Sequence, residues 1–552
     1  VLTATIARQH GALPVDLEAF PPDPRLIDEM GVEACLAGET VPVRRLAGAT
    51  VLATARPEAF EALAPALPES FGTPVMAFAA TRDIHAAIVS ARGDLLAARA
   101  AHRCPPEESC RGLDRAHPQA MLALVMAVVA VALLAPGGLL AALLGWALIT
   151  LVIGTALKAA AAIAALRRPP PEPPVEIGAL PVVSVIVPLF HEADIAERLI
   201  ARLARVSYPK ELLDICLVTE ADDTTTREML ARADLPFWMR VIAVPGGAPR
   251  TKPKALNFAL DFCRGSIVGV WDAEDAPAPD QIHRIVRRFA TAPADVACLQ
   301  GMLDFYNSGR NWLSRCFTAE YAGWFRLILP GLARIGLVVP LGGTTLFFRR
   351  AALEALGGWD AHNVTEDADL GVRLARHGWR TELIETVTEE EANCRAWPWV
   401  RQRTRWVKGY AMTWAVHMRR PARLWHDLGA LRFLGLQVVF LGTLSQFLLA
   451  PALWAFWLWR PTSGAAAATV LIFVLSEAVN LAVALAGLRR AGKRRLWWVA
   501  LTLPVYFPLA ALAAYRALFQ LASRPFHWEK TAHGAFHAAG PEAGEAWLAA
   551  AE

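Results

Sequence analysis

The sequence predicts an α/β, Rossmann-like domain inserted between transmembrane helices, together with a second, small α/β domain that precedes them. Three observations support this fold class. Long apolar stretches flank the middle of the chain, short apolar runs of strand length alternate with helical stretches between about residues 179 and 420, and residues 1–100 precede every apolar stretch. Alternating strands and helices predict a parallel sheet whose ligand site lies at the carboxyl ends of the strands.

The composition agrees with a chain that is partly embedded in a membrane. Of the 552 residues, 55% are hydrophobic and only 19% are charged, and the mean hydropathy is +0.34. This balance excludes a disordered chain. The net charge of +4 is not the concentrated basic charge of a nucleic-acid binder, so no nucleic-acid partner is expected. The eight cysteines form no Cys-x-x-Cys pair, and we expect reduced thiols, not a zinc site.

Residues 1–100 predict a small cytosolic α/β domain with a regulatory or docking role. Alternating residues over 41–57 predict a β-hairpin around Ala47 and Gly48, and amphipathic helices are expected at 58–67 and 82–98. The residue types needed for a catalytic site do not gather there. A linker over residues 101–118 then leads to the first apolar stretch.

Residues 119–166 predict a transmembrane hairpin. Ala120 to Leu157 contains no charged residue. As one helix this stretch would be about 57 Å long, against a hydrocarbon core of about 30 Å, so it must fold back. Pro136 supplies the break. Arginines flank both ends, which places both in the cytoplasm by the positive-inside rule. A stiff, proline-rich linker over 167–178 follows.

Residues 431–519 predict further transmembrane or interfacial helices, and residues 520–552 form a C-terminal tail. The apolar stretches are 433–459, 469–488 and 496–515. Three full spans would leave the tail outside the cytoplasm. Because the last stretch carries two prolines, we expect an interfacial or re-entrant segment among these stretches and favour a cytoplasmic tail.

Residues 179–420 predict the catalytic domain, because acidic residues gather at the ends of its buried strands. The strands are expected at 182–190, 215–220, 240–244 and 267–271. Glu192 follows the first, Asp222 and Asp223 follow the second, and Asp272, Glu274 and Asp275 follow the last. Clustered acids at a strand end suit a divalent cation that carries phosphate oxygens. Capping of the next helix is the alternative.

Basic and helix-capping residues complete this pattern. Lys252 and Lys254 precede the last strand and suit a diphosphate, although solvated loop lysines are the alternative. Thr365 is expected to cap a helix whose first turn holds Glu366 and Asp367. An ionised Asp367 in a cleft is a candidate general base, and a helix-capping acid is the alternative. Asp369 and Arg373, four residues apart, are expected to pair on the helix surface.

Two further stretches suit a sugar ligand. Gly342 and Gly343 allow the backbone to approach a ligand closely. Residues 397–410 combine arginines, which suit a phosphate leaving group, with indoles, which suit sugar faces. The alternative for 397–410 is an amphipathic helix at the membrane surface.

The motifs DD (222–223), DAED (272–275), TED (365–367) and QRTRW (402–406) occur in this order. Together they resemble the membrane-integrated family 2 glycosyltransferases, the group of cellulose, chitin and hyaluronan synthases, over about residues 179–420. This resemblance implies a GT-A-like fold. Glu274 departs from it, since many relatives have Asp there. A related subgroup resembles DAED with a C-terminal motif that HWEKTAHG (527–534) matches here.

The resemblance also implies roles for single residues. Asp367 would take the proton from the acceptor hydroxyl in an inverting, single-displacement transfer from a nucleotide-diphosphate sugar such as a UDP-sugar. The nucleotide would contact Glu192, Asp222, Asp223, Lys254, Asp272, Arg403 and Arg405. Mg²⁺ or Mn²⁺ would be held by Asp272 and Glu274, and the acceptor would contact Gly343, Thr344, Gln402 and Trp406.

Residues 1–100 resemble the N-terminal domain of type II secretion and pilus ATPases. Some of those domains bind cyclic di-GMP, so cyclic di-GMP or a partner protein is the expected ligand of this domain. The binding motif of that family lies largely in helices that would precede or overlap Val1–His10. A docking module is the alternative.

The predicted activity is synthesis of an exported polysaccharide by a multi-pass protein of the bacterial inner membrane, with its catalytic domain in the cytoplasm. Transfer of one sugar to a lipid is an alternative, and a catalytically silent, nucleotide-sensing receptor or scaffold is another. Glu477 and Asn480 lie within an apolar stretch. We expect them either to bond a neighbouring helix or to line a polar path for a glycan.

Overall fold

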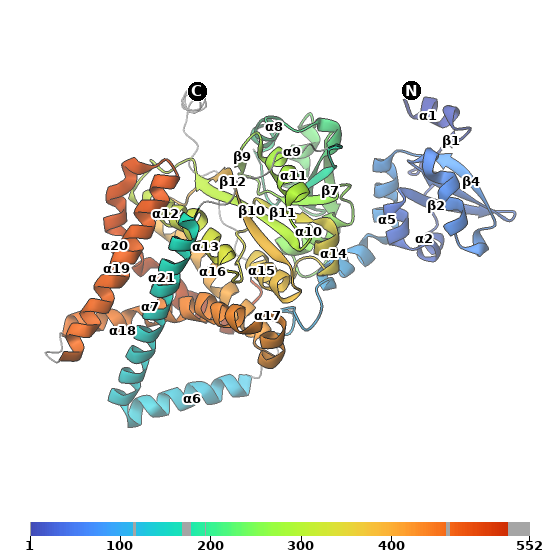
Figure 1. Ribbon diagram of the computed structural model, residues 1–552. Helices are drawn as coiled ribbons and strands as arrows, with labels where there is room; N and C mark the ends of the chain where they lie inside the picture. The colour runs from blue at the N-terminus through green and yellow to red at the C-terminus, as the bar shows by residue number, and fades with distance from the viewer. Residues whose placement is uncertain (1, 114–117, 168–177, 194, 460–463, 528–552) are drawn as a thin grey trace.

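The computed structural model describes residues 2–113, 118–167, 178–193, 195–459 and 464–527. Figure 1 shows a small N-terminal domain on one side, a central α/β domain, and a group of long helices on the other side. Most of the proline-rich linker and of the C-terminal tail, including all of the HWEKTAHG motif except His527, lies outside the described residues.

The N-terminal domain is the predicted small α/β unit. Its sheet has the order β1-β4-β3-β2, and Ala47 and Gly48 form the hairpin turn with φ of 48° and 81°, the left-handed geometry of a tight hairpin. The helix expected at 58–67 consists of three short helical pieces, whereas the one expected at 82–98 is part of a 22-residue helix. The elements are α1 (Leu2–Gln9), β1 (Leu13–Pro14), α2 (Pro24–Met30), α3 (Val32–Ala37), β2 (Thr40–Leu46), β3 (Ala49–Thr54), α4 (Phe60–Leu63), β4 (Thr73–Phe78) and α5 (Thr81–His102).

The central domain is built on one sheet of the order β7-β6-β5-β8-β11-β10-β12-β9. The four expected strands are present and parallel. The sheet as a whole is mixed, however, because β11 runs antiparallel to β8 and β10. Leu346 at the start of β11 pairs with Val270 at the end of β8, so the chain enters β11 from the ligand edge and runs back. The strands are β5 (Val183–Leu189), β6 (Leu213–Glu220), β7 (Met239–Val244), β8 (Ile267–Val270), β9 (Ala276–Pro277), β10 (Val296–Phe305), β11 (Leu346–Arg349) and β12 (Arg380–Glu390).

Helices cover both faces of this sheet, as the alternation along β5 requires. Val183, Val185 and Val187 pack with residues of α8 and α11 on one face, and Ile186 packs with residues of α10 on the other. The helices of the domain are α8 (Ala196–Ala204), α9 (Thr224–Arg232), α10 (Lys252–Leu260), α11 (Gln281–Thr291), α12 (Trp312–Gly323), α13 (Leu329–Arg334), α14 (Arg350–Ala355), α15 (Glu366–Arg376) and α16 (Ala396–His417).

In the described part of the chain, three helices are long and apolar enough to cross a membrane: Pro136–Leu166, Pro421–Trp454 and Ala467–Arg490. A helix pair bent by 44°, Arg494–Tyr506 with Pro508–Ser523, would make a fourth. This bend falls beside Pro508, in one of the stretches among which an interfacial or re-entrant segment is expected. The elements are α6 (Pro118–Leu134), α7 (Pro136–Leu166), α17 (Pro421–Leu436), α18 (Thr443–Trp459), α19 (Gly464–Arg490), α20 (Leu503–Tyr506) and α21 (Pro508–Ser523).

The predicted break at Pro136 is where α6 ends and α7 begins. In Figure 1, α6 leaves α7 at a wide angle instead of running alongside it. The hairpin and its orientation in a membrane stay predictions.

Candidate active site

One cavity of about 840 Å³ joins the central domain to the long helices. It begins at the carboxyl ends of β5, β6 and β8, where the sheet predicts a ligand site, and it continues between α7, α18, α19 and α21. Nine of the predicted site residues line it: Asp272, Glu274, Gly343, Thr344, Asp367, Gln402, Arg403, Arg405 and Trp406. Four others lie outside its lining: Glu192, Asp222, Asp223 and Lys254.

The donor end of the cavity, which we define by Glu220, Arg250, Lys252, Asp272 and Glu274, holds a tight ion pair. Lys252 Nζ donates to Asp272 Oδ1 at 2.5 Å and to the Gly343 carbonyl at 3.0 Å. Burial opposes the lysine charge, but Asp272 and Glu366 outweigh it and hold the pKa of Lys252 above its usual range. The ammonium therefore stays charged beside the acidic loop.

Asp275 holds the acidic loop over residues 272–275 in place from its buried side. It is fully buried, and its Oδ2 accepts from the Asp272 backbone N–H at 2.8 Å and from the Thr344 hydroxyl. Burial, with the charges of Asp272 and Glu274, raises its pKa well above the usual range. Asp275 is thus a structural acid that connects the loop after β8 to the loop before β11.

The acidic side chains at the donor end of the cavity suit a divalent cation that a substrate also coordinates. Burial and the neighbouring acids Asp275, Glu274 and Asp272 raise the pKa of Glu390 well above its usual range, so these carboxylates repel one another. The Oδ1 of Asp275 and the Oε1 of Glu390 are buried without a hydrogen-bond partner among the described residues. No three or more His, Cys, Asp or Glu side chains converge as a ready metal site in the described chain. Mg²⁺ typically takes only one or two carboxylates and completes its shell with phosphate oxygens and water.

Asp223, predicted to bind the nucleotide, has its carboxylate occupied by the protein. Its side chain caps α9 by accepting from the Thr226 N–H and hydroxyl, and it accepts from the His191 N–H at 2.6 Å. These hydrogen bonds outweigh burial and lower the pKa of Asp223. Asp222 stands at the rim, where it pairs with Arg250 at 2.6 Å. Glu220, the last residue of β6, is the nearby acid that lines the cavity.

Of the two lysines at the start of α10, Lys252 lines the cavity, whereas Lys254, which the resemblance implies as a nucleotide contact, does not. Lys254 is buried, and its Nζ donates to the Gly247 carbonyl at 2.8 Å outside the cavity lining. Because the two residues are two positions apart at the start of α10, only one of them faces the acidic loop. The structure places Lys252 there.

Asp367 lies in the first turn of α15, as expected, with its carboxylate in the cavity. Its Oδ1 accepts from the Ala368 N–H at 2.9 Å. Burial raises its pKa, while burial and the charge of Asp367 raise the pKa of Glu366 to about 7. A Cβ atom on Gly343 would lie 3.3 Å from Asp367 Oδ2, so this glycine leaves room beside the carboxylate.

Two expectations for α15 are wrong in detail. Thr365 occupies the N-cap position, but its side chain makes no capping hydrogen bond, and its hydroxyl is buried without a partner among the described residues. Asp369 and Arg373 do not pair on the surface. Both are buried, and Asp369 pairs with His417 of α16 at 3.0 Å, because this side of α15 faces the protein interior.

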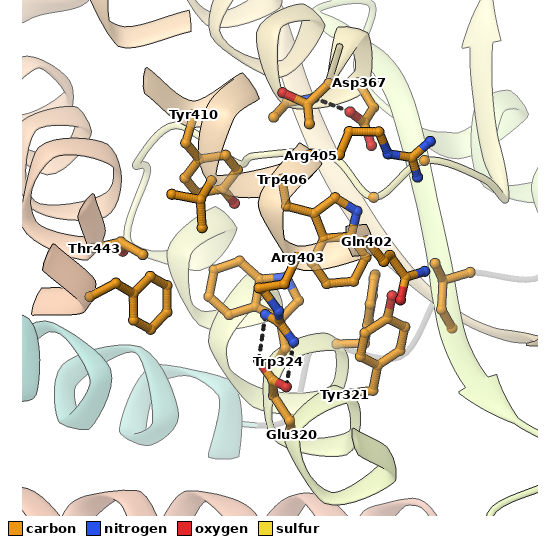
Figure 2. A pocket seen from close by; sticks show the side chains of 18 of the residues that line it. Glu320, Tyr321, Trp324, Asp367, Gln402, Arg403, Arg405, Trp406, Tyr410 and Thr443 are labelled. Carbon is orange, nitrogen blue, oxygen red and sulfur yellow. Dashed lines mark hydrogen bonds and ion pairs between the residues drawn. The ribbon is translucent and has the colours of Figure 1, made fainter. Parts of the chain in front are cut away.

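The two arginines of the QRTRW motif have different surroundings. Arg403 donates two hydrogen bonds to Glu320, at 2.7 and 2.8 Å, and its guanidinium lies between Trp399 and Trp406. Figure 2 shows Arg403 and Glu320 on one side of Trp406, and Arg405 and Asp367 on the other. The structure therefore assigns Arg403 to a buried pair that ties α16 to α12. Arg405 is the arginine close to the acids of α15, and its charge offsets part of the rise in their pKa values.

The predicted acceptor residues lie between these two arginines. Trp406 stacks on Tyr321 with ring centroids 6.2 Å apart and an interplanar angle of 28°. Gln402 accepts from Asn393 at 2.9 Å. Both side chains line the same cavity as Asp367.

The end of the cavity between the long helices, which we call the membrane end, is lined by hydroxyl, amide and charged side chains. Thr155 of α7 donates to Ser476 of α19 at 3.0 Å, and Lys158 donates to Asn480 at 3.0 Å. Glu477 lines the same space, as the path hypothesis requires. Apolar residues, among them Leu453, Trp454 and Phe473, complete the lining.

The sequence analysis did not identify Glu320, Glu390 or Lys158. Glu320 is a single acid within an apolar helical stretch, which is a signal that could have marked it. Glu390 is the middle residue of a run of three acids, and Lys158 is the first charge after the long apolar stretch. Nothing in the sequence alone shows that these three residues meet one cavity.

The central domain is similar to known proteins. Residues 181–409 match the family model described as glycosyltransferase like family 2, which supports the GT-A-like fold of the central domain. Beta-monoglucosyldiacylglycerol synthase of Synechocystis sp. is 29% identical over 270 residues, which are 46% of this chain and 55% of that protein. Glucomannan 4-beta-mannosyltransferase 7 of Arabidopsis thaliana is 26% identical over 240 residues, 42% of this chain and 43% of that protein.

Among solved structures, the mannosyltransferase PcManGT from Pyrobaculum calidifontis, in complex with GDP-Man and Mn²⁺, is 20% identical. The match covers 65% of this chain and 98% of that chain, with a TM-score of 0.45. The chain spans about half the length of the curated relatives it matches.

Proposed function

We propose that this protein, whose residues 181–409 form a family 2 glycosyltransferase domain, is a membrane-bound, inverting glycosyltransferase that builds a polysaccharide from a nucleotide-diphosphate sugar. The observation that carries this proposal is the continuity of the cavity. A single space contains the acids of the donor end, Asp367, and the polar side chains between the long helices.

The chemistry follows from the order of these groups. The ionised Asp367 takes the proton of the acceptor hydroxyl, and the hydroxyl oxygen attacks the anomeric carbon of the donor sugar. The bond from that carbon to the diphosphate breaks, and its electron pair leaves with the diphosphate. Lys252 and Arg405 offset this developing negative charge. Trp406 and Gln402 hold the acceptor sugar next to Asp367.

Asp272 and Glu274 are the side chains that would hold Mg²⁺ or Mn²⁺. When bound, the cation would offset the charge of the diphosphate. The release of Asp272 from Lys252 would free the lysine for the same diphosphate. Glu220, Arg250 and Asp222 at the rim are the groups left for the nucleoside.

The polar lining of the membrane end favours a polymer as the product. Sugar hydroxyls need hydrogen-bond partners at membrane depth, and Thr155, Ser476 and Asn480 supply hydroxyl and amide groups there. We place the protein in the bacterial inner membrane with the catalytic domain in the cytoplasm, from the arginines that flank the first apolar stretch.

Transfer of one sugar to a lipid is the second candidate. The similarity to beta-monoglucosyldiacylglycerol synthases favours it, as do Leu453, Trp454 and Phe473 in the cavity lining. A silent receptor is disfavoured, because a buried acid such as Glu366 is costly to keep without a ligand.

Incorporation of radiolabelled sugar tests the proposal. The full chain in lipid nanodiscs is given UDP- and GDP-sugars with Mg²⁺ or Mn²⁺, and the product is separated into polymer, glycolipid and free sugar. We expect labelled polymer with at least one donor, and none from Asp272→Ala. Labelled glycolipid would select the second candidate. No transfer from any donor would contradict both.

A further inference from the structure

The segment between the N-terminal domain and the first long helix packs against the catalytic domain and is not a free spacer. Residues 103–113, which we call the strap, follow α5 directly and lie against the catalytic domain, and Cys104, Glu108, Ser109 and Cys110 are buried. Arg103 pairs with Asp261 at the end of α10 at 2.6 Å. Gly357, with φ of 75°, receives the strap closely, since a Cβ atom there would lie 2.5 Å from the Arg103 carbonyl oxygen.

The middle of the strap is fixed by two acids. Asp360 of the catalytic domain accepts from the Ser109 hydroxyl at 2.8 Å and from the Cys110 N–H at 2.6 Å. In the opposite direction, Glu108 of the strap reaches the C-terminal end of α15. It accepts from Arg373 Nε at 3.1 Å, lies 3.4 Å from Arg376, and contacts His377 at 3.1 Å.

Glu108 is well suited to hold that end of the helix. Its side chain is 5% exposed, so little water competes for its partners. Burial opposes its charge, but His377, Arg373 and Arg376 outweigh burial and lower the pKa of Glu108 to about 2. Arg376 also pairs with Asp427 at 2.8 Å, so the partners that depend most on Glu108 are Arg373 and His377. Loss of the Glu108 charge leaves these two less well compensated.

The other end of α15 carries Glu366 and Asp367. The helix has 11 residues, so its ends are about 15 Å apart. A tilt of about 4° at one end of such a rod moves the other end by about 1 Å, and a misplacement of 1 Å can cost as much as about 100-fold in rate. A contact at the C-terminal end can therefore set the position of the base.

We propose that Glu108 is a positioning residue for transfer: it anchors α15 through Arg373, Arg376 and His377 and so holds Asp367 in its working position. This inference rests on the proposed function, in which Asp367 is the base. Because the strap continues from α5, Glu108 also joins the N-terminal domain to the catalytic helix.

The test compares Glu108→Gln with Glu107→Gln in the full chain in nanodiscs. Glu107 is the adjacent residue, has the same chemistry and is exposed, so it is the matched control. For Glu108→Gln we expect a loss of about 10-fold in kcat with the KM for the nucleotide sugar within 2-fold, since the donor-binding loops do not touch Glu108. Glu107→Gln should match the wild type in both.

Hydrogen exchange of the α15 amides gives a readout that needs no substrate. Exchange over residues 366–376 should be faster in Glu108→Gln and unchanged in Glu107→Gln. If Glu108→Gln does not fold, His377→Ala carries the test, because that side chain is 44% exposed and its loss removes one partner of Glu108. It should show the same changes at about one third of the size.

The outcomes separate the two claims. Wild-type kcat and wild-type exchange in the Glu108 variant, or a rise in KM with kcat unchanged, would overturn the inference. Absence of sugar transfer by the wild type would overturn the proposed function, while the exchange of α15 would still show whether Glu108 anchors the helix.

Discussion

The donor end and the membrane end of the cavity are built in opposite ways. At the donor end, short loops that follow neighbouring strands bring the acids and Lys252 together. At the membrane end, Lys158 of α7 meets Asn480 of α19, more than 300 positions away in the chain. Local sequence therefore determines the donor chemistry, whereas only the packing of distant helices creates the route for the acceptor or product. The predictions below test each end separately.

The largest effect is expected at the junction of the two ends. Asp367→Asn keeps the shape of the side chain but removes the base, so transfer should fall by about 10³-fold. Affinity for the nucleoside diphosphate, measured by calorimetry, should stay within 2-fold. Wild-type turnover by this variant would remove Asp367 from the mechanism.

Substitution of the two arginines of QRTRW should affect different properties, activity for Arg405 and stability for Arg403. Arg405→Ala should lower kcat by about 10²-fold with the thermal unfolding temperature unchanged, since it removes a charge that offsets the leaving diphosphate. Arg403→Ala removes the bidentate partner of Glu320, which is 21% exposed and keeps a hydrogen bond from Tyr506. It should destabilise the fold by about 1–3 kcal/mol.

Thermal unfolding in detergent, beside the kinetics, separates the two arginine variants. A stable, active Arg403→Ala would contradict the structural assignment of this arginine.

The pH dependence of transfer should report the acid pair of α15. Burial and Asp367 raise the pKa of Glu366 to about 7, so the pair still holds a proton below that pH, and kcat should rise with pH up to about 7 and then level off. Glu366→Gln removes one of the two competing charges, which eases ionisation of Asp367. The acid limb of the kcat profile should then move to lower pH, and an unmoved limb would exclude a shared proton.

The smallest effect is expected for substitution of Glu477, at the membrane end. Glu477→Gln preserves hydrogen bonding, so a purely structural role predicts normal folding and normal product. If Glu477 lines the path of a glycan, Glu477→Gln should give shorter or less product at normal nucleotide hydrolysis, and Glu477→Leu should be more severe. Product length is measured by gel filtration of labelled polymer. Wild-type length from both variants would end the path hypothesis.

The sequence was most informative where chemistry depends on neighbours in the chain. The four parallel strands, the N-terminal hairpin, the acids after β8 and the first turn of α15 all follow from local patterns. It was less informative where two similar side chains lie close together. Lys252 differs from Lys254, and Arg403 from Arg405, only in the direction in which each points from its helix. The structure was also needed to identify Glu320, Glu390 and Glu108. The side chains with which they interact lie at least 83, 115 and 265 positions away in the chain, respectively.

One pair of variants tests the central claim, that the chemistry at Asp367 and the space between the long helices form one working cavity. Gly154 of α7 lines the cavity, and Gly145 of the same helix does not. A Cβ atom at either would meet nothing within 4 Å, so both positions can accept a larger residue. Gly154→Trp should fill the cavity, whereas Gly145→Trp is the matched control.

The measurement is labelled product against hydrolysis of the nucleotide sugar, in the full chain in nanodiscs. For Gly154→Trp we expect product to fall by about 10-fold or more while donor hydrolysis stays within 2-fold, because the donor end is untouched. Gly145→Trp should match the wild type in both. Wild-type product from Gly154→Trp would contradict the account, since transfer would then not need the space between the helices.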